Sequence, residues 1–186
     1  MSELLVSCEG LDGAGTTTLV ESIGAARPEY VTTAEPTDNP FGEAIRENLA
    51  ASSDPVVDLL LFVADRRQHL IEEIEPALEQ GSTVVTDRYV DSTRAYQPIS
   101  LVEETAADVF FSELQAKNYI EWLHGYWHRE PDLTLFIDVP VETALERSSL
   151  EEKYENRAFL EQAQQNYRSL AEFRDRIVTI DGTQSK

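Results

Sequence analysis

The chain has 186 residues, of which 35 are acidic and 15 are basic, so its formal net charge at pH 7 is −20. This length suits one domain with a full hydrophobic core, and an acidic surface repels nucleic-acid phosphates, which argues against DNA or RNA as a partner. The single cysteine, Cys8, excludes an internal disulfide and any multi-cysteine metal site. Because the acids are spread along the chain, we interpret them as an adaptation to high salt, where screening removes most of the self-repulsion.

The N-terminal sequence MSELLVSCEG has no basic region followed by a long apolar stretch, so it does not have the pattern of a signal peptide. No window approaches the 18 apolar residues that a membrane-spanning helix needs. We therefore expect a cytoplasmic protein without a membrane partner.

Five short apolar runs are typical of β-strands: LLVSC at 4–8, EYVTT at 29–33, STVVTD at 82–87, DLTLFIDV at 132–139 and RIVTI at 176–180. Helices are predicted between them at about 16–27, 41–51, 55–80, 102–128, 141–148 and 156–175. In the third helix, Pro76 indicates a kink or a tightened last turn, and Gly81 indicates its end.

The alternation of strands and helices predicts an α/β fold, with a parallel sheet covered by helices on both faces. Ligands of such sheets bind beyond the carboxyl ends of the strands. Functional residues are therefore expected just after positions 8, 33, 87 and 139.

The segment EGLDGAGTTT follows the first predicted strand and nearly matches the phosphate-binding pattern G-x-x-x-x-G-K-[ST]. Gly10 and Gly15 have the required separation and Thr17 has the required hydroxyl, but Thr16 stands in the lysine position. Glycines let backbone N–H groups approach phosphate oxygens, and a threonine hydroxyl at this place can bind Mg²⁺. An ordinary strand-to-helix turn is the alternative interpretation.

The segment TDRYVDSTRAYQ at 86–97 follows the third predicted strand, and we interpret it as a loop. Asp87 is well placed to hold a metal ion or its water shell. Arg88 and Arg94 offer the planar guanidinium that recognises phosphate. An Asp–Arg ion pair that only fixes the loop is the alternative.

Phe62 and Arg66 are four residues apart in a predicted helix, so they share one helix face. There they are suited to stacking on a nucleotide base and hydrogen-bonding its edge. The alternative places Phe62 in the core and pairs Arg66 with Asp65 or Glu73 on the surface. His124 and His128, one helical turn apart among aromatic residues, indicate an aromatic packing surface rather than a zinc site.

The polar segment RSSLEEKYENRAF at 147–159 contains three cations, at positions 147, 153 and 157. A mobile lid that closes over phosphates needs such groups. A solvated connection between two helices explains the segment equally well.

Taken together, six segments resemble the thymidylate kinase family in order and spacing: EGLDGAGTTT, EPTDNPFGEAIRENL, LLFVADRRQH, IEPALEQGSTVVTDRYVDSTRAYQ, PDLTLFIDVPVETALERS and YENRAFLEQAQQNYRSLA. That family phosphorylates dTMP to dTDP using ATP. The resemblance implies the P-loop NTPase fold, with a five-stranded parallel sheet flanked by helices on both faces. It also implies one nucleoside monophosphate kinase domain over residues 1–186, a lid at about 148–158, Mg²⁺ as cofactor, and a homodimer formed through helix faces.

The resemblance further implies roles for individual residues. The ATP phosphates would be held by Gly10, Gly13, Ala14, Gly15, Thr16, Thr17 and Thr18, and the metal by Thr17 and Asp87. The residues implied at the reaction itself are Asp12, near the 3′-hydroxyl or the acceptor phosphate, together with Asp87 and Arg88. Around dTMP, Phe62 would stack on thymine, Arg66 would hydrogen-bond the base, Ser92 and Gln97 would read the pyrimidine edge, Tyr96 would pack on the sugar and Arg88 would hold the phosphate. Arg147 would lie near adenine, with Lys153 or Arg157 contributing from the lid.

Two departures from the family concern phosphate-facing cations. Thr16 replaces the phosphate-loop lysine, and Ala34 precedes Glu35 and Pro36 where the family often has an arginine. Such cations are worth on the order of 10²–10⁴ in rate. Two alternatives to an ATP-dependent dTMP kinase therefore stay open: a nucleotide-binding homologue with weak or no kinase activity, and a kinase for another deoxynucleotide or a nucleoside.

Overall fold

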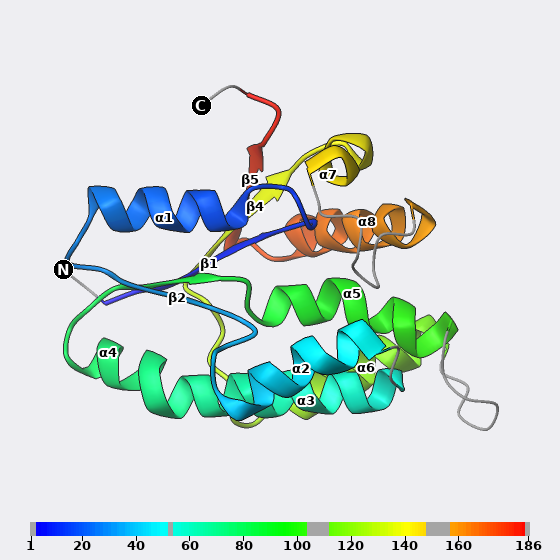
Figure 1. The fold of residues 1–186 in the computed structure, drawn as a ribbon, viewed down its shortest axis with the longest axis horizontal. Coiled ribbons are helices and arrows are strands. Elements are labelled where there is room, and N and C mark those ends of the chain that lie inside the picture. The colour runs from blue at the N-terminus through cyan, green and yellow to red at the C-terminus, as the bar shows by residue number, and fades with distance from the viewer. Residues whose placement is uncertain (1–2, 52–53, 104–111, 148–156, 185–186) are drawn as a thin grey trace.

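The computed structural model describes residues 3–51, 54–103, 112–147 and 157–184. Its centre is a parallel sheet with the strand order β2-β3-β1-β4-β5 (Figure 1). The strands are β1 (Leu5–Gly10), β2 (Val31–Ala34), β3 (Val84–Asp87), β4 (Leu133–Asp138) and β5 (Ile177–Asp181). All five predicted strands are therefore confirmed, with bounds that differ from the prediction by at most two residues.

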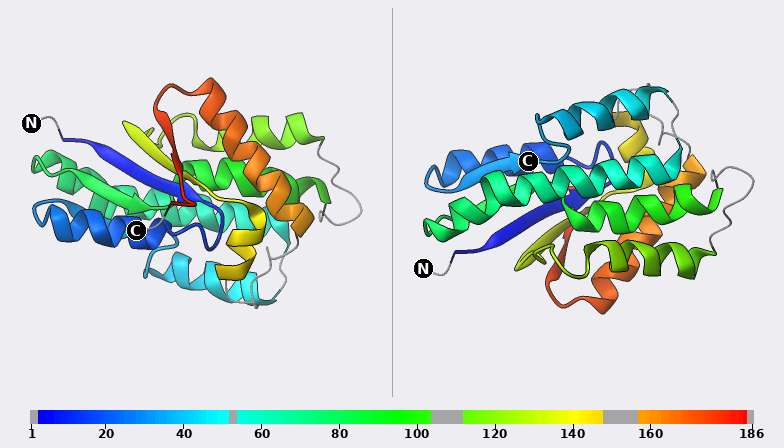
Figure 2. Two further views of the ribbon diagram at one scale, coloured as in Figure 1. Left: turned by 90° about the horizontal axis from the view of Figure 1, so that it is seen from above. Right: turned by 90° about the horizontal axis from the view of Figure 1, so that it is seen from below.

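The helical elements are α1 (Thr16–Ala26), α2 (Pro40–Ala51), α3 (Pro55–His69), the π-helix η1 (Leu70–Ile74), α4 (Glu75–Glu79), α5 (Val90–Glu103), α6 (Glu113–His124), α7 (Val141–Arg147) and α8 (Arg157–Phe173). On one face of the sheet, Val20 of α1 packs against Val6, Cys8 and Val85. The elements from α3 to α5 and α8 cover the other face, as the views in Figure 2 also show. The predicted layering, with helices on both faces, is confirmed.

The central strand β1 is buried along its whole length between β3 and β4. A strand covered on both faces is normally a run of apolar residues. Ser7 and Glu9 break that run on the face that carries α5 and α8. Because a buried polar group without a partner costs free energy, both residues need partners from neighbouring elements.

The long helix predicted at 55–80 is one continuous helical stretch with a wider turn in its middle. In η1 the N–H of Glu75 bonds to the carbonyl of Leu70, five residues back. This wide turn ends at Ile74, two residues before Pro76, whose ring would clash with the carbonyl four residues back in a regular α-helix. Gly81, with φ +83°, ends the stretch in the predicted way, through the left-handed conformation that glycine adopts freely.

The prediction of a loop at 86–97 is wrong beyond Tyr89, because α5 begins at Val90. Residues 93–101 are all buried, so this part of the helix has no solvent-exposed face, and buried polar residues such as Thr93, Arg94 and Gln97 obscure the amphipathic pattern that would reveal it in the sequence. Pro98 lies inside it. Tertiary packing rather than local propensity therefore supports α5.

The helix predicted at 102–128 is shorter where the structure describes it. It begins as α6 after Ser112, whose side chain forms a reciprocal capping box with Gln115. Among the described residues, no helix is long and apolar enough to cross a membrane.

Candidate active site

The loop between β1 and α1 has the backbone geometry of a tight phosphate-binding turn. Gly13 and Gly15 adopt left-handed φ angles of 80° and 102°. At Gly10 a Cβ atom would lie 2.9 Å from both the Ala14 Cβ and the Ile137 carbonyl oxygen, so only glycine fits. No side chain caps the start of α1, and its first turn contains no acid. The first N–H groups of α1 are therefore suited to donating hydrogen bonds to a bound anion.

Thr17 and Asp87 meet at the carboxyl edge of the sheet, although 70 residues separate them. The Thr17 hydroxyl donates to Asp87 Oδ2 at 2.5 Å, and the buried Asp87 Oδ1 has no hydrogen-bond partner among the described residues. No group of three or more His, Cys, Asp or Glu side chains in the described ranges has metal-site geometry. The pair fits Mg²⁺, which typically takes one or two protein oxygens and completes its shell with phosphate and water.

Arg88 adopts a left-handed backbone conformation, φ 65°, which is rare for a residue with a Cβ atom. Its N–H donates to the Cys8 carbonyl at 2.9 Å, and its own carbonyl accepts the Thr86 hydroxyl at 2.7 Å. Its guanidinium donates to Asp12 Oδ1 at 2.6 Å and to the Gly10 carbonyl at 3.1 Å. Arg88 is thereby held directly against the phosphate loop.

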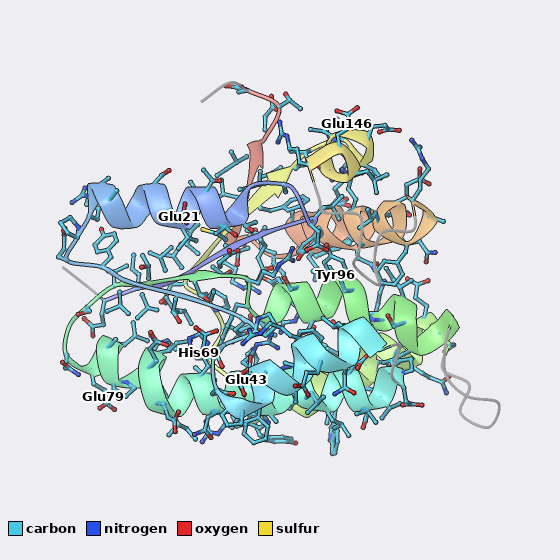
Figure 3. All side chains as sticks on the ribbon, viewed as in Figure 1. Glu21, Glu43, His69, Glu79, Tyr96 and Glu146 are labelled. Atoms are coloured by element: carbon cyan, nitrogen blue, oxygen red, sulfur yellow. The ribbon has the colours of Figure 1, made fainter. Side chains whose placement is uncertain are left out.

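Asp12 also contacts Tyr96, which belongs to the next part of the site. Its Oδ2 accepts the Tyr96 hydroxyl at 3.3 Å, and Tyr96 projects from α5 toward α8, where its ring meets the edge of Tyr167 at 6.0 Å (Figure 3). The Arg88 guanidinium lies 5.7 Å from the Tyr96 ring centroid and donates to the Ser92 hydroxyl at 3.2 Å. Four predicted site residues, Asp12, Arg88, Ser92 and Tyr96, are thus brought together beside the phosphate loop. Burial by itself would lower the pKa of Arg88, but the carboxylate of Asp12 raises it well above its usual value.

Arg66, on α3, is fully buried, and its guanidinium contacts residues from three other parts of the fold. Its Nε and Nη2 both donate to Glu35 Oε2, at 2.9 and 2.7 Å, and its Nη1 donates to Thr93 Oγ1 at 3.0 Å. The same Nη1 lies 3.0 Å from His124 Nε2. The His124 Nδ1 lies 2.8 Å from the Ile120 carbonyl, so Nδ1 bears the proton and Nε2 accepts from Arg66. Burial, followed by the charge of Arg66, lowers the pKa of His124 to about 3 and keeps its ring neutral.

The alternative of a surface pair between Arg66 and Asp65 or Glu73 is wrong, because Asp65 accepts from Thr37 instead. Phe62 is half-buried one turn before Arg66 on α3. Gln97, on α5, is buried, with 3% of its surface exposed.

Arg94 is not at the site, although it was singled out together with Arg88. Its five N–H groups donate to Asp91, Glu121 and Glu130, at 2.5–3.0 Å. Since a guanidinium has five N–H donors, Arg94 has none left for a phosphate. It joins α5 to α6 and to the segment before β4.

The family model described as thymidylate kinase matches residues 8–186. A probable thymidylate kinase of Halobacterium salinarum is 42% identical over 185 residues, which are 98% of this chain and 89% of that protein. One from Halorubrum lacusprofundi is 39% identical over 184 residues, 98% of this chain and 91% of that protein. The solved structure of thymidylate kinase from Candida albicans superposes with a TM-score of 0.81 at 26% identity, covering 97% of this chain and 84% of that one.

The chain belongs to the thymidylate kinase family. Its fold is accordingly the P-loop NTPase fold that the resemblance implied.

The remaining predicted site residues of this thymidylate kinase family member lie toward α7 and α8. Arg147 is exposed at the end of α7. Arg157, at the start of α8, pairs with Glu142 and Glu161 on the surface. Lys153 lies outside the described residues, as does most of the predicted lid at 148–158. In the described part of the chain, no hydrogen bond or ion pair joins Arg147 or Arg157 to the phosphate loop.

Glu9 is a buried residue next to the candidate site that sequence reasoning missed. It is completely buried on β1, and it accepts hydrogen bonds from the Tyr89 N–H, the Ser92 hydroxyl and the Tyr167 hydroxyl. The signal that could have revealed it is an acid at the end of an otherwise apolar strand. Burial raises the pKa of Glu9 to about 7.

Proposed function

We propose that this protein transfers the γ-phosphoryl group of ATP to dTMP and forms dTDP, with Mg²⁺ as cofactor. The observation that carries the proposal is the cluster of Asp12, Arg88, Ser92 and Tyr96 against the phosphate loop. It lies in a chain whose residues 8–186 match the thymidylate kinase family model. No observation favours a non-catalytic nucleotide-binding protein.

On the donor side, we assign the ATP phosphates to the loop from Gly10 to Thr18 and to the uncapped start of α1. Thr17 and Asp87 would hold Mg²⁺, which neutralises phosphate charge during transfer. Arg147, Lys153 and Arg157 would serve the adenine and the lid. The protein's part is positioning and charge stabilisation, since phosphoryl transfer needs little covalent work from it.

On the acceptor side, we assign the dTMP phosphate to Arg88 and the sugar to Tyr96. Phe62 would stack on thymine, while Arg66, Ser92 and Gln97 would read the base and position the nucleotide. The Glu35 bonds hold the Arg66 guanidinium in one orientation, and such preorganisation lowers the entropic cost of recognition. Asp12 would lie between the phosphate loop and the acceptor, because it holds both Arg88 and Tyr96.

The missing loop lysine is the chief chemical question for this assignment. Thr16 is buried, with 6% of its surface exposed, and it offers a hydroxyl in place of an ammonium. We assign the compensating charge to the lid cations or to K⁺, which an acidic protein adapted to high salt would meet in abundance. These sources differ in one measurable respect, because only the second makes turnover depend on potassium.

The deciding experiment measures dTDP formation from ATP and dTMP with Mg²⁺ in molar KCl, for the parent protein and for Thr16→Lys. We expect substantial turnover by the parent and a change of less than about tenfold in the variant. If the parent binds dTMP and makes no dTDP, the non-catalytic alternative replaces the proposal. Calorimetry with dTMP, dUMP and dCMP then separates a dTMP kinase from a kinase for another deoxynucleotide.

We further propose one nucleoside monophosphate kinase domain over residues 1–186, with a lid at 148–158, that works in the cytoplasm as a homodimer. Support for a dimer comes from large apolar side chains exposed on helix faces, including Leu114 and Trp122 on α6 and Leu60 on α3. The strongly acidic composition and the relatives from salt-loving archaea support a protein adapted to high salt.

A further inference from the structure

Glu9 joins three elements beneath the proposed dTMP site. Its Oε1 accepts the Tyr89 N–H at 2.9 Å. Its Oε2 accepts the Ser92 hydroxyl at 2.6 Å and the Tyr167 hydroxyl at 3.2 Å. A fully buried carboxylate is expensive, and the function proposed above gives Glu9 no part. Its contacts lead directly to the two residues that hold each other next to the phosphate loop, Arg88 and Ser92.

The first link from Glu9 to Arg88 is through the backbone. Arg88 has a φ of 65°, a conformation that a residue with a Cβ keeps only where its surroundings over-determine it. The Cys8 carbonyl holds the Arg88 N–H, and the Thr86 hydroxyl holds the Arg88 carbonyl. Glu9 holds the next N–H along the chain, that of Tyr89, so the turn is fixed on both sides of Arg88.

The second link is through the Ser92 side chain. A serine hydroxyl has one proton and two lone pairs. Because Ser92 donates its proton to Glu9 at 2.6 Å, its two lone pairs can accept from Arg88 Nη1 at 3.2 Å and from the Tyr167 hydroxyl, 2.9 Å away. Glu9 therefore sets both the backbone turn and the orientation of a side-chain acceptor for the same guanidinium.

We infer that Glu9, in its carboxylate form, is a positioning residue that holds Arg88 and Ser92 in the geometry that binds the dTMP phosphate. The inference rests on the proposed function, which places that phosphate at Arg88. Both oxygens of the Glu9 carboxylate must accept, one from Tyr89 and the other from Ser92. A glutamine has one acceptor oxygen and one NH₂ group. Its NH₂ group would therefore point at either the Tyr89 N–H or the Ser92 hydroxyl, so that two donors would face each other.

The surroundings of Glu9 make its ionisation sensitive to pH near neutrality. Burial is the largest cause that raises its pKa to about 7, and the charge of Asp91 adds to it, while the Ser92 bond and the charges of Arg88 and Arg66 oppose it. The charged and titratable groups that face it are Arg88 and Asp91 beside or on α5, Arg66 on α3, Tyr167 on α8 and Cys8 on its own strand. Below this pKa, one oxygen gains a proton and becomes a donor. We therefore expect the KM for dTMP to rise as the pH falls through about 7.

The decisive comparison is between the parent and Glu9→Gln, with Ser7→Ala as the matched control. Ser7 lies two residues earlier on the same strand and face, buried, with its hydroxyl bonded to Thr134 at 2.8 Å. In Glu9→Gln at pH 8 we expect the KM for dTMP to rise about tenfold or more, with a smaller change in kcat and an unchanged KM for ATP. The rise in KM near pH 7 should vanish, leaving only the component from the phosphate of dTMP, which protonates near pH 6.

Thermal stability separates positioning from a merely structural role. In Glu9→Gln at pH 8, relief from a buried charge offsets the cost of one donor facing another, so the melting temperature should stay close to that of the parent. Ser7→Ala should lower the melting temperature without a change in the KM for dTMP. If Glu9→Gln melts earlier and keeps its KM, or if both variants shift the KM alike, the inference is overturned.

Tyr167→Phe keeps the test decisive should Glu9→Gln fail to fold. It removes the 3.2 Å bond to Oε2 together with the 2.9 Å hydrogen bond between Tyr167 and Ser92, and it spares both carboxylate oxygens. A lost donor raises the pKa of a carboxyl group. The pH at which the KM for dTMP begins to rise should therefore move upward, and an unmoved profile would count against the inference. If the parent makes no dTDP, the proposed function fails, and the dissociation constants of dTMP for parent and Glu9→Gln still decide the role of Glu9.

Discussion

The orientations of key side chains in this protein are fixed by partners far away in the sequence. Arg66 takes its orientation from Glu35, 31 residues earlier, and from His124, 58 residues later. Both members of the Arg66–Glu35 pair are almost completely buried, with 1% and 3% of their side chains exposed. A buried guanidinium that loses its counter-charge keeps the whole cost of desolvation.

Replacing Glu35 with Gln should therefore lower the free energy of unfolding by roughly 3–5 kcal/mol. The measurement is urea unfolding at fixed KCl, because a charged denaturant would screen the acidic surface. Arg66→Met and the double variant complete a double-mutant cycle. In the double variant neither charge is left unpaired. The decrease in its free energy of unfolding should therefore be clearly smaller than the sum of the decreases in the two single variants. Strict additivity would show that the pair is not coupled.

At the scale of single residues, the sequence predicted which residues lie at the site better than it predicted the groups to which they bond. The helical spacing of Phe62 and Arg66 correctly placed both on α3, and Asp12, Arg88, Ser92 and Tyr96 do lie together. The local signal for Glu9, an acid at the end of an apolar strand, does not reveal that the acid is buried or which groups it bonds. Such contacts depend on how the elements pack, which no short segment of sequence encodes.

Among the elements, α5 matters most for the site, because it begins two residues after Arg88 and carries Ser92, Tyr96 and Gln97. It was also the element that the sequence analysis missed, since burial on all sides leaves it without periodicity. An ion-pair cluster fixes its first turns: Asp91 accepts from Arg94 on α5 and from Arg176 just before β5. Glu130 accepts from the same two arginines.

This cluster should make the protein acid-sensitive in a way that one variant can isolate. Burial by itself would raise the pKa of Asp91, but its bonds to Arg176 and Arg94 lower it below its usual value. A lowered folded-state pKa gives stability that is present above the unfolded pKa, near 3.9, and lost as the pH falls through the folded value. Asp91→Asn should be less stable than the parent at pH 7 and should lose less stability on acidification.

Urea midpoints measured from about pH 6 to pH 2 test this expectation. Glu79→Gln is the matched control, because it removes an exposed acid from α4. The control should keep the parent's acid profile. Equal slopes for Asp91→Asn and the parent would contradict a role for the cluster in acid stability.

For the whole molecule, the sequence was sufficient to predict the architecture. Five apolar runs separated by helical stretches permit few arrangements once crossovers must be right-handed and connections short. The strands, their parallel orientation and the covering on both faces followed from that alternation, whereas the order of the strands in the sheet comes from the structure. What alternation does not specify is a helix without a solvent-exposed face, such as α5 over residues 93–101, or a wide turn such as η1 inside a longer helix.

The net charge is also a property of the whole molecule, and it predicts a dependence of stability on salt. With 35 acids and 15 bases, 20 negative charges have no cation in the chain to balance them. Exposed acids lie on several sides, such as Glu21 on α1, Glu43 on α2, Glu79 on α4 and Glu146 on α7 (Figure 3). In 1 M salt the screening length falls to about 3 Å, so repulsion between these elements should largely disappear, and the urea midpoint should rise from dilute buffer to molar KCl.

Replacing those four glutamates with glutamine changes the net charge from −20 to −16, and this separates screening from other effects of salt. The variant should be more stable than the parent in dilute buffer, because each removed charge relieves repulsion there. In molar KCl the difference should shrink, since screening has already relieved it. Sucrose, which favours compact states by exclusion and carries no charge, should stabilise parent and variant alike. If the variant gains as much from KCl as the parent does, self-repulsion is not the cause of the salt dependence.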